Sequence, residues 1–327
     1  MQVLVTGGTG FIGIHLVAAL VARGWRVRCL VRATSNRQPL AVYPVDYVVG
    51  HLQDDAALRQ AVQGVDLIFH LAGATKARTP AEFERINTEG TQRLLAACAV
   101  AGTALRSFVY VSSIAAAGPS ASIVPVTEDD PPRPVGPYGK SKRRAEEAVL
   151  GAGASMPVTV LRPSAIYGAY DTDFLDLFRT VQRGWLPCVG PQDLYVDICH
   201  VDDLVQGMMA AAMCPAAYGE VFFLGGAPHT WRDIGREIAR QMGKRAREIR
   251  LSRGLVLSAA TLADTWARAS GRPSLLSRDN LLERLQPFWI FDSSKAGRTF
   301  GYAPRISLAT GVAQTLQWYQ NAGWLPR

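Results

Sequence analysis

Several features that would place this chain in a specialised class are missing from it. The five cysteines are scattered, at Cys29, Cys98, Cys188, Cys199 and Cys214. None belongs to a Cys-x-x-Cys pair, which argues against both a disulfide framework and a zinc site, so we expect reduced thiols and no bound metal. The nearest approach to a long apolar run, residues 204–219, is interrupted by polar residues and by Pro215. We therefore expect no transmembrane segment.

Signals for export and for nucleic-acid binding are also missing. The chain opens directly on a β-branched run, without a basic stretch and a small-residue cleavage site, so we expect no secretion signal and a cytoplasmic location. The formal charge of +8 comes from dispersed basic residues with no nucleic-acid-binding motif, so we predict no nucleic-acid partner. One local basic run, from Arg236 to Arg253, is most simply a solvated surface.

The chain is organised around its first thirteen residues, MQVLVTGGTGFIG. Residues 2–6 predict a buried strand, and the apolar residues of 11–20 recur at helical spacing. Between them Gly7 allows a tight turn, Gly10 lets the backbone approach a pyrophosphate, and Gly13 lets the helix pack closely on the strand. The helix N-terminus then faces the phosphates. This Gly-x-x-Gly-x-x-Gly stretch predicts a dinucleotide-binding turn.

Strands and helices alternate through the first half of the chain. Strands are predicted at 25–31, 45–50, 67–71, 107–112 and 158–161, with long helices at 80–101 and 140–150. The alternation predicts an α/β protein with a Rossmann-type doubly wound parallel sheet.

Beyond Pro163 the pattern loosens. Here we predict a strand at 220–224 and helices at 201–213, 231–242, 255–269 and 308–322. We therefore expect a nucleotide-binding domain over 1–162 with about 197–225. A smaller, mostly helical substrate-binding domain would take about 163–196 and 226–327, with a cleft between the two.

Three residues suggest acid/base chemistry. Tyr138 and Lys142 lie four residues apart at the start of a predicted helix, so their side chains share one face. A phenol beside an ammonium has its pKa lowered and becomes a general acid/base near neutral pH. Ser113 follows a predicted strand at the edge of the sheet where ligands bind, and its hydroxyl can orient a substrate oxygen.

Seven stretches then give the chain a resemblance to a known family. They are TGGTGFIG at 6–13, HLAG at 70–73, NTEGT at 87–91, VSS at 111–113, YGKSK at 138–142, LRPSAIYG at 161–168 and HVDDL at 200–204. With these stretches in this order, the chain resembles the extended short-chain dehydrogenases/reductases, also called the NAD(P)-dependent epimerase/dehydratase family. It looks closest to the branch that holds 3β-hydroxysteroid dehydrogenases and dihydroflavonol reductases.

The resemblance implies roles for particular residues. Ser113, Tyr138 and Lys142 would form a catalytic triad, and Lys142 would also bind the nicotinamide ribose. Further cofactor contacts are implied at Gly7, Gly10, Phe11, Ile12, Gly13, Leu52, Leu71, Ala72, Gly73, Ser112, Pro163 and Ser164. Of these, the last two would line the nicotinamide, Leu52 would act through its backbone, and Asn87 would support the site. The resemblance also implies a homodimer, formed by pairing of the helices 80–101 and 140–150.

Three positions depart from the family's usual pattern. NAD-preferring members usually end the second strand with an acidic residue, whereas this chain has Val31 followed by Arg32. Because an arginine can hold a 2′-phosphate, we predict binding of NADP through Arg32, with NAD as the alternative cofactor. His51 stands where an aspartate is usual. Ala165 stands where sugar-nucleotide members tend to carry asparagine.

Three functions compete. The first is hydride transfer between nicotinamide and a bulky, apolar, sterol-like or flavonoid-like alcohol or ketone. The second is epimerisation or dehydration of a sugar nucleotide, and the third is a non-catalytic cofactor-binding regulator. Ala165 favours the first, as do the apolar residues of the C-terminal half, which suit a hydrophobic pocket. Those residues are Leu255, Val256, Leu257, Leu262 and Trp266, with Trp185 and Trp289.

Overall fold

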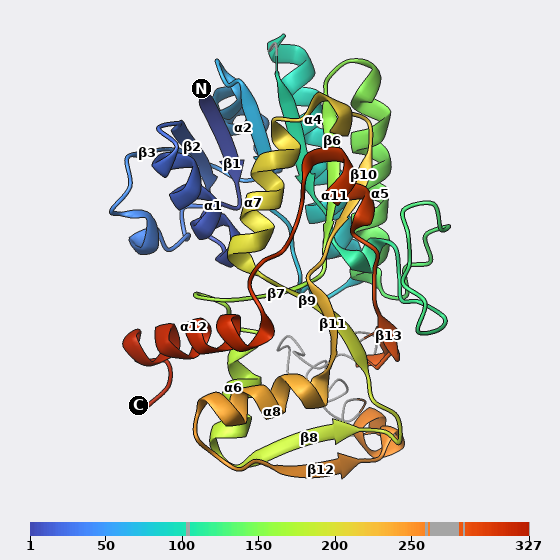
Figure 1. The fold of residues 1–327 in the computed structure, drawn as a ribbon. Helices are drawn as coiled ribbons and strands as arrows, with labels where there is room; N and C mark the ends of the chain where they lie inside the picture. The colour runs from blue at the N-terminus through green and yellow to red at the C-terminus, as the bar shows by residue number, and fades with distance from the viewer. Residues whose placement is uncertain (103–104, 259–260, 262–280, 284, 327) are drawn as a thin grey trace.

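The larger lobe is built on a seven-stranded sheet. The computed structural model describes residues 1–327 apart from 103–104, 259–260, 262–280, 284 and 327. The strands are β1 Gln2–Thr6, β2 Arg26–Val31, β3 Val45–Val49, β4 Leu67–His70, β5 Ser107–Val111, β6 Val158–Pro163 and β10 Val221–Leu224. They follow the spatial order β10-β6-β5-β4-β1-β2-β3, and every neighbouring pair is parallel (Figure 1). The predicted doubly wound α/β fold is confirmed.

Helices cover both faces of this sheet. They are α1 Phe11–Ala22, α2 Asp55–Val62, α3 Pro80–Phe83, α4 Gly90–Ala101, α5 Pro137–Gly151 and α7 Val201–Ala212. Side chains alternate along a strand, so Val3 and Val5 of β1 join the apolar cluster under α1 and α7. Leu4 joins the opposite cluster, under α2, α4 and α5. Both faces of the sheet are therefore buried, as continuous apolar strands require.

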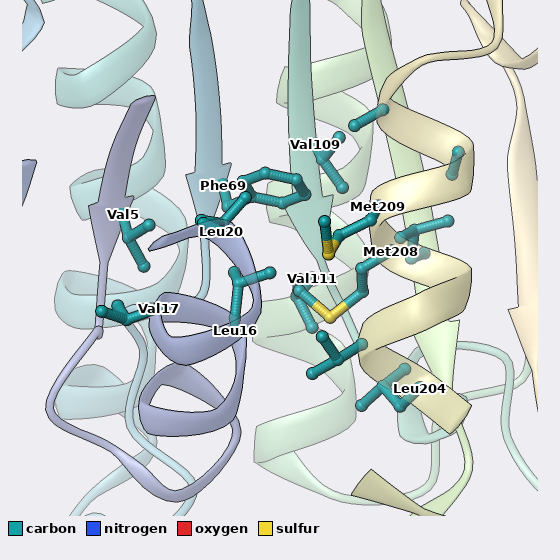
Figure 2. Packing of buried hydrophobic residues seen from close by; sticks show 14 of the residues in the cluster. Val5, Leu16, Val17, Leu20, Phe69, Val109, Val111, Leu204, Met208 and Met209 are labelled. Carbon is teal, nitrogen blue, oxygen red and sulfur yellow. The ribbon is translucent and has the colours of Figure 1, made fainter. Parts of the chain in front are cut away.

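The first of these clusters fixes the helix that follows the glycine turn. Figure 2 shows Val5 and Phe69 of the sheet beside α1, whose Leu16 and Leu20 point toward them. From the other side, Met208 of α7 reaches into the same layer. All five side chains are fully buried. Burying a side chain of this size is worth about 1.5 to 3 kcal/mol, so the cluster holds the N-terminus of α1 firmly at the sheet edge.

The smaller lobe contains more strands than the sequence predicted. Its strands are β7 Ala165–Tyr167, β8 Trp185–Val189, β9 Tyr195–His200, β11 Ala227–Thr230, β12 Arg247–Leu251 and β13 Phe288–Trp289, and its helices are α6 Leu175–Gln182, α8 Trp231–Gln241 and α12 Leu308–Asn321. β9 pairs with β7, β11 and β13, while β8 pairs with β12 (Figure 1). The helices still hold more of the described residues than these short strands do, but we did not predict the strands. Strands of two to six residues are too short to show a clear alternation of apolar and polar residues.

The structure also tests our predictions for the C-terminal helices, the cysteines and membrane-spanning segments. Within the predicted helix 255–269, residues 255–258 are helical, and most of the remainder lies outside the described residues. The helix α11 Ser294–Phe300, which we did not predict, packs on β10 and α7. All five cysteines are free thiols. Among the residues that the structure describes, no helix has both the length and the apolar character needed to cross a membrane.

Candidate active site

A cavity of about 350 Å³ opens at the carboxyl ends of the central strands. β1 lies between β2 and β4, so the strand order reverses there, and ligands of doubly wound sheets bind at such a point. The cavity is lined by Gly7, Gly10, Phe11, Ile12, Gly13, Leu71, Gly73, Ala74, Thr75, Lys76, Val111, Ser112, Tyr138, Lys142, Asp171, Thr172 and Asp173. Ten of the residues predicted to bind a cofactor therefore line this cavity.

The glycine turn forms one side of this cavity. Gly7 has φ of +74°, which favours glycine, and a Cβ there would lie 2.8 Å from the backbone nitrogen of Ala72. A Cβ on Gly13 would collide with the Gly7 carbonyl oxygen. Helix α1 starts after Gly10 with no side-chain cap. Its first backbone N–H groups are therefore available to an anion in the cavity.

A buried chain of hydrogen bonds holds the loop after β4 against this turn. Thr91 Oγ1 donates to the Asn87 carbonyl oxygen at 2.6 Å and contacts His70 Nε2 at 2.9 Å, so His70 donates from Nε2. His70 Nδ1 then accepts from Thr6 Oγ1 at 2.6 Å, and Thr6 Oγ1 accepts the Ala72 N–H at 3.1 Å. Burial lowers the pKa of His70 to about 3, so the ring is neutral and this polarity is fixed.

Asn87 ties the same loop to helix α5. It lies in a π-helical turn, Glu84–Glu89, which joins α3 to α4 inside the predicted helix 80–101. Asn87 Oδ1 accepts the Ala74 N–H at 2.7 Å, and Nδ2 donates to the Ala74 carbonyl at 3.0 Å and to Ser141 Oγ at 2.9 Å. A Cβ on Gly73 would lie only 3.0 Å from Asn87 Oδ1. π turns are frequent at functional sites, and this one contains Asn87, whose side chain holds the backbone of Ala74 at the cavity wall.

The structure brings the predicted triad together. Ser113 follows β5, accepts the Ala115 N–H at 3.1 Å, and lies close enough to the Tyr138 phenol to lower its pKa. Tyr138 and Lys142 lie one turn apart at the start of α5. Lys142 Nζ donates to the Val111 carbonyl at 2.8 Å. The Tyr138 phenol and the Lys142 amine thus line the cavity, with Ser113 beside the phenol, in an arrangement suited to proton transfer to a substrate oxygen.

One expectation about this triad is wrong. Burial raises the pKa of Tyr138 to about 12, and the negative charge of Glu283 adds to the rise, while the nearby Ser113 hydroxyl opposes it. Burial also lowers the pKa of Lys142 to about 7, against the attraction of Glu146. The four-residue spacing placed the two groups correctly but carried no information on their desolvation. In this structure the phenol is fully protonated at neutral pH.

Ser112 is hydrogen-bonded to a buried ion pair that we did not predict from the sequence. Its hydroxyl donates to Glu146 Oε1 at 2.6 Å. Arg162 donates from Nε to Oε1 at 2.9 Å and from its terminal nitrogen to Oε2 at 2.8 Å. Glu146 is 0% exposed and Arg162 is 2% exposed. The spacing Tyr138, Lys142, Glu146, at intervals of four residues on one helix face, is the signal that could have identified the glutamate.

Other predicted cofactor residues do not line the cavity. Arg32 is exposed just after β2, and its backbone N–H donates to Ser35 Oγ at 3.1 Å. Leu52 is buried against Gly90. Ala72, Pro163 and Ser164 also lie off the cavity wall. The roles assigned to these residues stay predictions.

Pro163 and Ser164 are held at the end of β6. Pro163 is paired with Leu224 in the sheet, and the Ser164 N–H donates to the Leu224 carbonyl at 3.1 Å. Asp197 accepts the Gly226 N–H at 2.8 Å, and burial raises the pKa of this carboxyl to about 7.

The apolar residues proposed for a substrate pocket are dispersed. Trp289 is 8% exposed and belongs to the core of the smaller lobe, while Trp185 is 45% exposed. Leu255 is 64% exposed, and Leu262 and Trp266 lie outside the described residues. Neither tryptophan lines the cavity, and no residue of the basic run does. The clustering expected from composition is therefore not found in the described part of the lobe.

The entrance of the cavity is polar. Lys76 Nζ lies 2.7 Å from Asp173 Oδ1, and both side chains are about half exposed. These two residues and Thr172 also border an adjoining open hollow of about 510 Å³, which continues to Leu175 and Trp324. Substrate can reach the triad from this side.

Comparison with known proteins identifies the family. Residues 3–225 match the model of the NAD dependent epimerase/dehydratase family. The chain belongs to this family. It is thus an NAD(P)-dependent enzyme of the extended short-chain dehydrogenase/reductase type, as the motifs predicted.

Two curated members of the family are similar to the chain over nearly its whole length. A ceramide reductase from Caulobacter vibrioides is 35% identical, covering 99% of this chain and 96% of the relative. A 3-beta-hydroxysteroid dehydrogenase from Mycolicibacterium neoaurum is 32% identical, covering 98% and 92%. Among solved structures, dTDP-glucose 4,6-dehydratase from Streptomyces venezuelae, with NAD and TYD bound, has a TM-score of 0.80 at 26% identity, covering 100% of this chain and 99% of that one.

The cavity suits the family's cofactor. The glycine turn has no room for a Cβ at Gly7 or Gly13, which leaves backbone N–H groups facing the space that a pyrophosphate would occupy. Lys142 lies on the same wall with donor capacity for ribose hydroxyls. Within the described residues, no cluster of His, Cys, Asp and Glu could hold a metal ion.

Proposed function

We propose that this family member reduces a ketone of a bulky, largely apolar substrate to the secondary alcohol, with NADPH. The observation that carries the proposal is the placement of the Tyr138 phenol and the Lys142 amine, one helical turn apart on α5, at the cavity. A neutral phenol is a proton donor, which is what the reducing direction needs. Oxidation of an alcohol would instead require the phenolate, which a pKa of about 12 makes scarce.

The residues of the chain divide the work as follows. When bound, the reduced nicotinamide would provide a hydride for the carbonyl carbon. Tyr138 donates its proton to the carbonyl oxygen, and the Ser113 hydroxyl orients that oxygen. Lys142 in its protonated form stabilises the tyrosinate that remains, and solvent restores the proton through the polar entrance beside Lys76. Ketone, hydride and one proton thus give the secondary alcohol and oxidised cofactor.

The choice of an apolar substrate rests on what the site lacks and on its relatives. Ala165 replaces the asparagine expected for a sugar nucleotide. None of the described residues of the basic run from Arg236 to Arg253 borders the cavity, so they offer no clamp for a diphosphate there. The two curated relatives are named for a ceramide and for a hydroxysteroid. These observations together favour a lipid-like ketone.

NADPH preference is part of the proposal. Arg32 is exposed at the end of β2, beside the strand that carries the glycine turn, where a 2′-phosphate is read in such sheets. An ionic hydrogen bond of this kind is worth about 1.5 to 3 kcal/mol, so Arg32→Glu should lower kcat/KM for NADPH by about 10 to 100-fold and spare NADH. A wild-type enzyme that prefers NADH would contradict the assignment.

The catalytic part is tested with Tyr138→Phe. Turnover of a sterol-like ketone should fall by about 10² to 10⁴-fold, while the Kd for NADPH stays within several-fold, because only the transferred proton is lost. Tyr43→Phe, outside the cavity, is the matched control and should leave both unchanged. Near wild-type turnover in Tyr138→Phe would sink the assignment.

The same assay separates the competing functions. A reductase releases one oxidised cofactor for each alcohol formed, whereas a sugar-nucleotide epimerase or dehydratase regenerates its own. The TM-score to the dTDP-glucose dehydratase makes this second candidate worth testing. Conversion of a sugar nucleotide at micromolar concentration, with no reaction of apolar ketones, would reverse the order. NADPH binding without turnover of any of these substrates would favour the non-catalytic regulator.

We also propose a homodimer and a cytoplasmic location. Helices α4 and α5 pack beside each other on one face of the sheet and would supply the four-helix contact that the family resemblance implies. Light scattering at micromolar protein should return twice the chain mass of 35.4 kDa. A mass near that of one chain would remove the dimer from the proposal.

A further inference from the structure

The ribbon formed by β8 and β12 lies at the end of the smaller lobe (Figure 1). Leu186 of β8 is 1% exposed and packs against Gly235 of α8, which defines the inner face. The strands are parallel, so partners in register point to the same side. The outer face therefore carries Trp185, Pro187 and Val189 from β8 and Arg247, Ile249 and Leu251 from β12.

These outer side chains reach solvent. Trp185 is 45% exposed, Pro187 is exposed, and Val189, Ile249 and Leu251 are each partly exposed. Contiguous apolar side chains at the surface of a soluble protein commonly mark a contact with a partner or a membrane. Leu255, 64% exposed, lies just beyond β12 and extends the apolar surface along the chain.

Positive charge surrounds this face without compensation. Arg245, Arg247 and Arg253 are exposed, and among the described residues none of them has an ion-pair partner. The carboxylate of the ribbon, Glu248, belongs to the inner face, where Arg236 of α8 binds it at 2.7 Å. The outer face thus combines an aromatic ring, aliphatic side chains and uncompensated arginines.

We propose that this outer face docks on the surface of an anionic lipid bilayer. Tryptophan and arginine suit the headgroup level, where the ring is half in apolar surroundings and the guanidinium meets phosphate. A second copy of the chain fits poorly, because pairing the face with itself would bring like charges together. This docking proposal depends only on the residues of the ribbon and not on the proposed function. A membrane contact would nevertheless bring the enzyme close to apolar ketones dissolved in the bilayer.

The test is co-sedimentation of the full chain with vesicles. Vesicles of phosphatidylcholine with one third phosphatidylglycerol should bind the protein, vesicles of phosphatidylcholine alone should bind it far less, and added salt should release it. The triple variant R245Q/R247Q/R253Q should lose about 100-fold in partitioning, at about fivefold per charge. R23Q/R59Q/R106Q removes as many exposed arginines from the larger lobe and should bind like the wild type.

A second variant tests the apolar half of the contact. Trp185→Ser keeps every charge and should still weaken binding by about tenfold or more, since the ring loses its apolar contact. Binding that is equal for both kinds of vesicle, or equal in the two triple variants, would overturn the proposal. So would vesicle-independent dimerisation that R245Q/R247Q/R253Q abolishes, or capture of oligonucleotides in place of vesicles. Unchanged turnover of a water-soluble ketone in these variants separates failure of docking from failure of the reaction.

Discussion

Breaking the buried pair of Glu146 and Arg162 gives the sharpest test of how this active site is held. The perturbation is Glu146→Gln, which keeps the shape of the side chain and removes its charge. Arg162 is 2% exposed and donates two hydrogen bonds to this carboxylate. The variant therefore leaves the guanidinium buried without a negatively charged partner. Breaking a buried pair in this way costs about 3 to 5 kcal/mol, a large part of the stability of an ordinary domain.

A double-mutant cycle isolates the pair from its surroundings. Arg162→Met should cost a similar amount, while Glu146→Gln with Arg162→Met together should cost much less than the sum, because no buried charge then lacks a partner. Arg144→Gln, on the same helix and 57% exposed, is the control and should change stability by less than about 1 kcal/mol. Urea unfolding measures all four variants. Additive losses, or a single-variant loss below about 1 kcal/mol, would refute the reasoning.

Glu146→Gln should also change the pKa of the Lys142 amine. The negative charge of Glu146 favours the ammonium form of Lys142, so Glu146→Gln should lower the pKa of Lys142 further below its ordinary range. The loss of kcat/KM should therefore be greater at pH 8 than at pH 6. A uniform loss across pH would show that Glu146 has a structural role only.

Further predictions concern the cofactor site. Because burial lowers the pKa of Lys142 to about 7, the ammonium predicted to bind ribose is lost as pH rises through 7. The Kd for NADPH from fluorescence titration should then rise by up to about tenfold per pH unit above that point. A pH-independent Kd between 6 and 9 would contradict this. Gly13→Ala should weaken NADPH binding severely, since its Cβ would collide with the Gly7 carbonyl, whereas Gly64→Ala, at a turn with open space around it, should affect stability alone. Equal NADPH affinity in both variants would disprove the packing argument.

Much of the larger lobe was predictable because its signals are local. Strands buried on both faces appear as apolar runs, and the glycine turn at Gly7 marks the first of them. The π turn around Asn87 was not predictable, since one inserted residue barely alters a helical pattern. The raised pKa of Tyr138 was missed for a different reason. Desolvation depends on what packs around a group, and residue spacing does not report it.

The smaller lobe shows where such reasoning fails. β8 and β12 are short strands whose pairing joins Trp185 to Arg247 across a long stretch of chain. Neither strand is recognisable without the other, because alternation over five residues is easily mimicked by a loop. The outer face that their pairing creates is therefore invisible in the sequence, where Trp185 looks like a pocket residue and Arg247 like part of a solvated basic run.

The strand order has a consequence for how activity is acquired during folding. The pairing of β1 with β4 joins Val3 to Leu67, and the residues that directly follow these strands, Gly7 and Leu71, line the cavity. Closing the loop between Val3 and Leu67 costs conformational entropy before the strand contacts form, and parallel pairings between distant segments form slowly. The α1 helix can form early from local contacts, yet the turn at Gly7 has no opposite wall until β4 docks. Catalytic competence therefore belongs to the last stages of folding, and no fragment that ends before Lys142 can possess it.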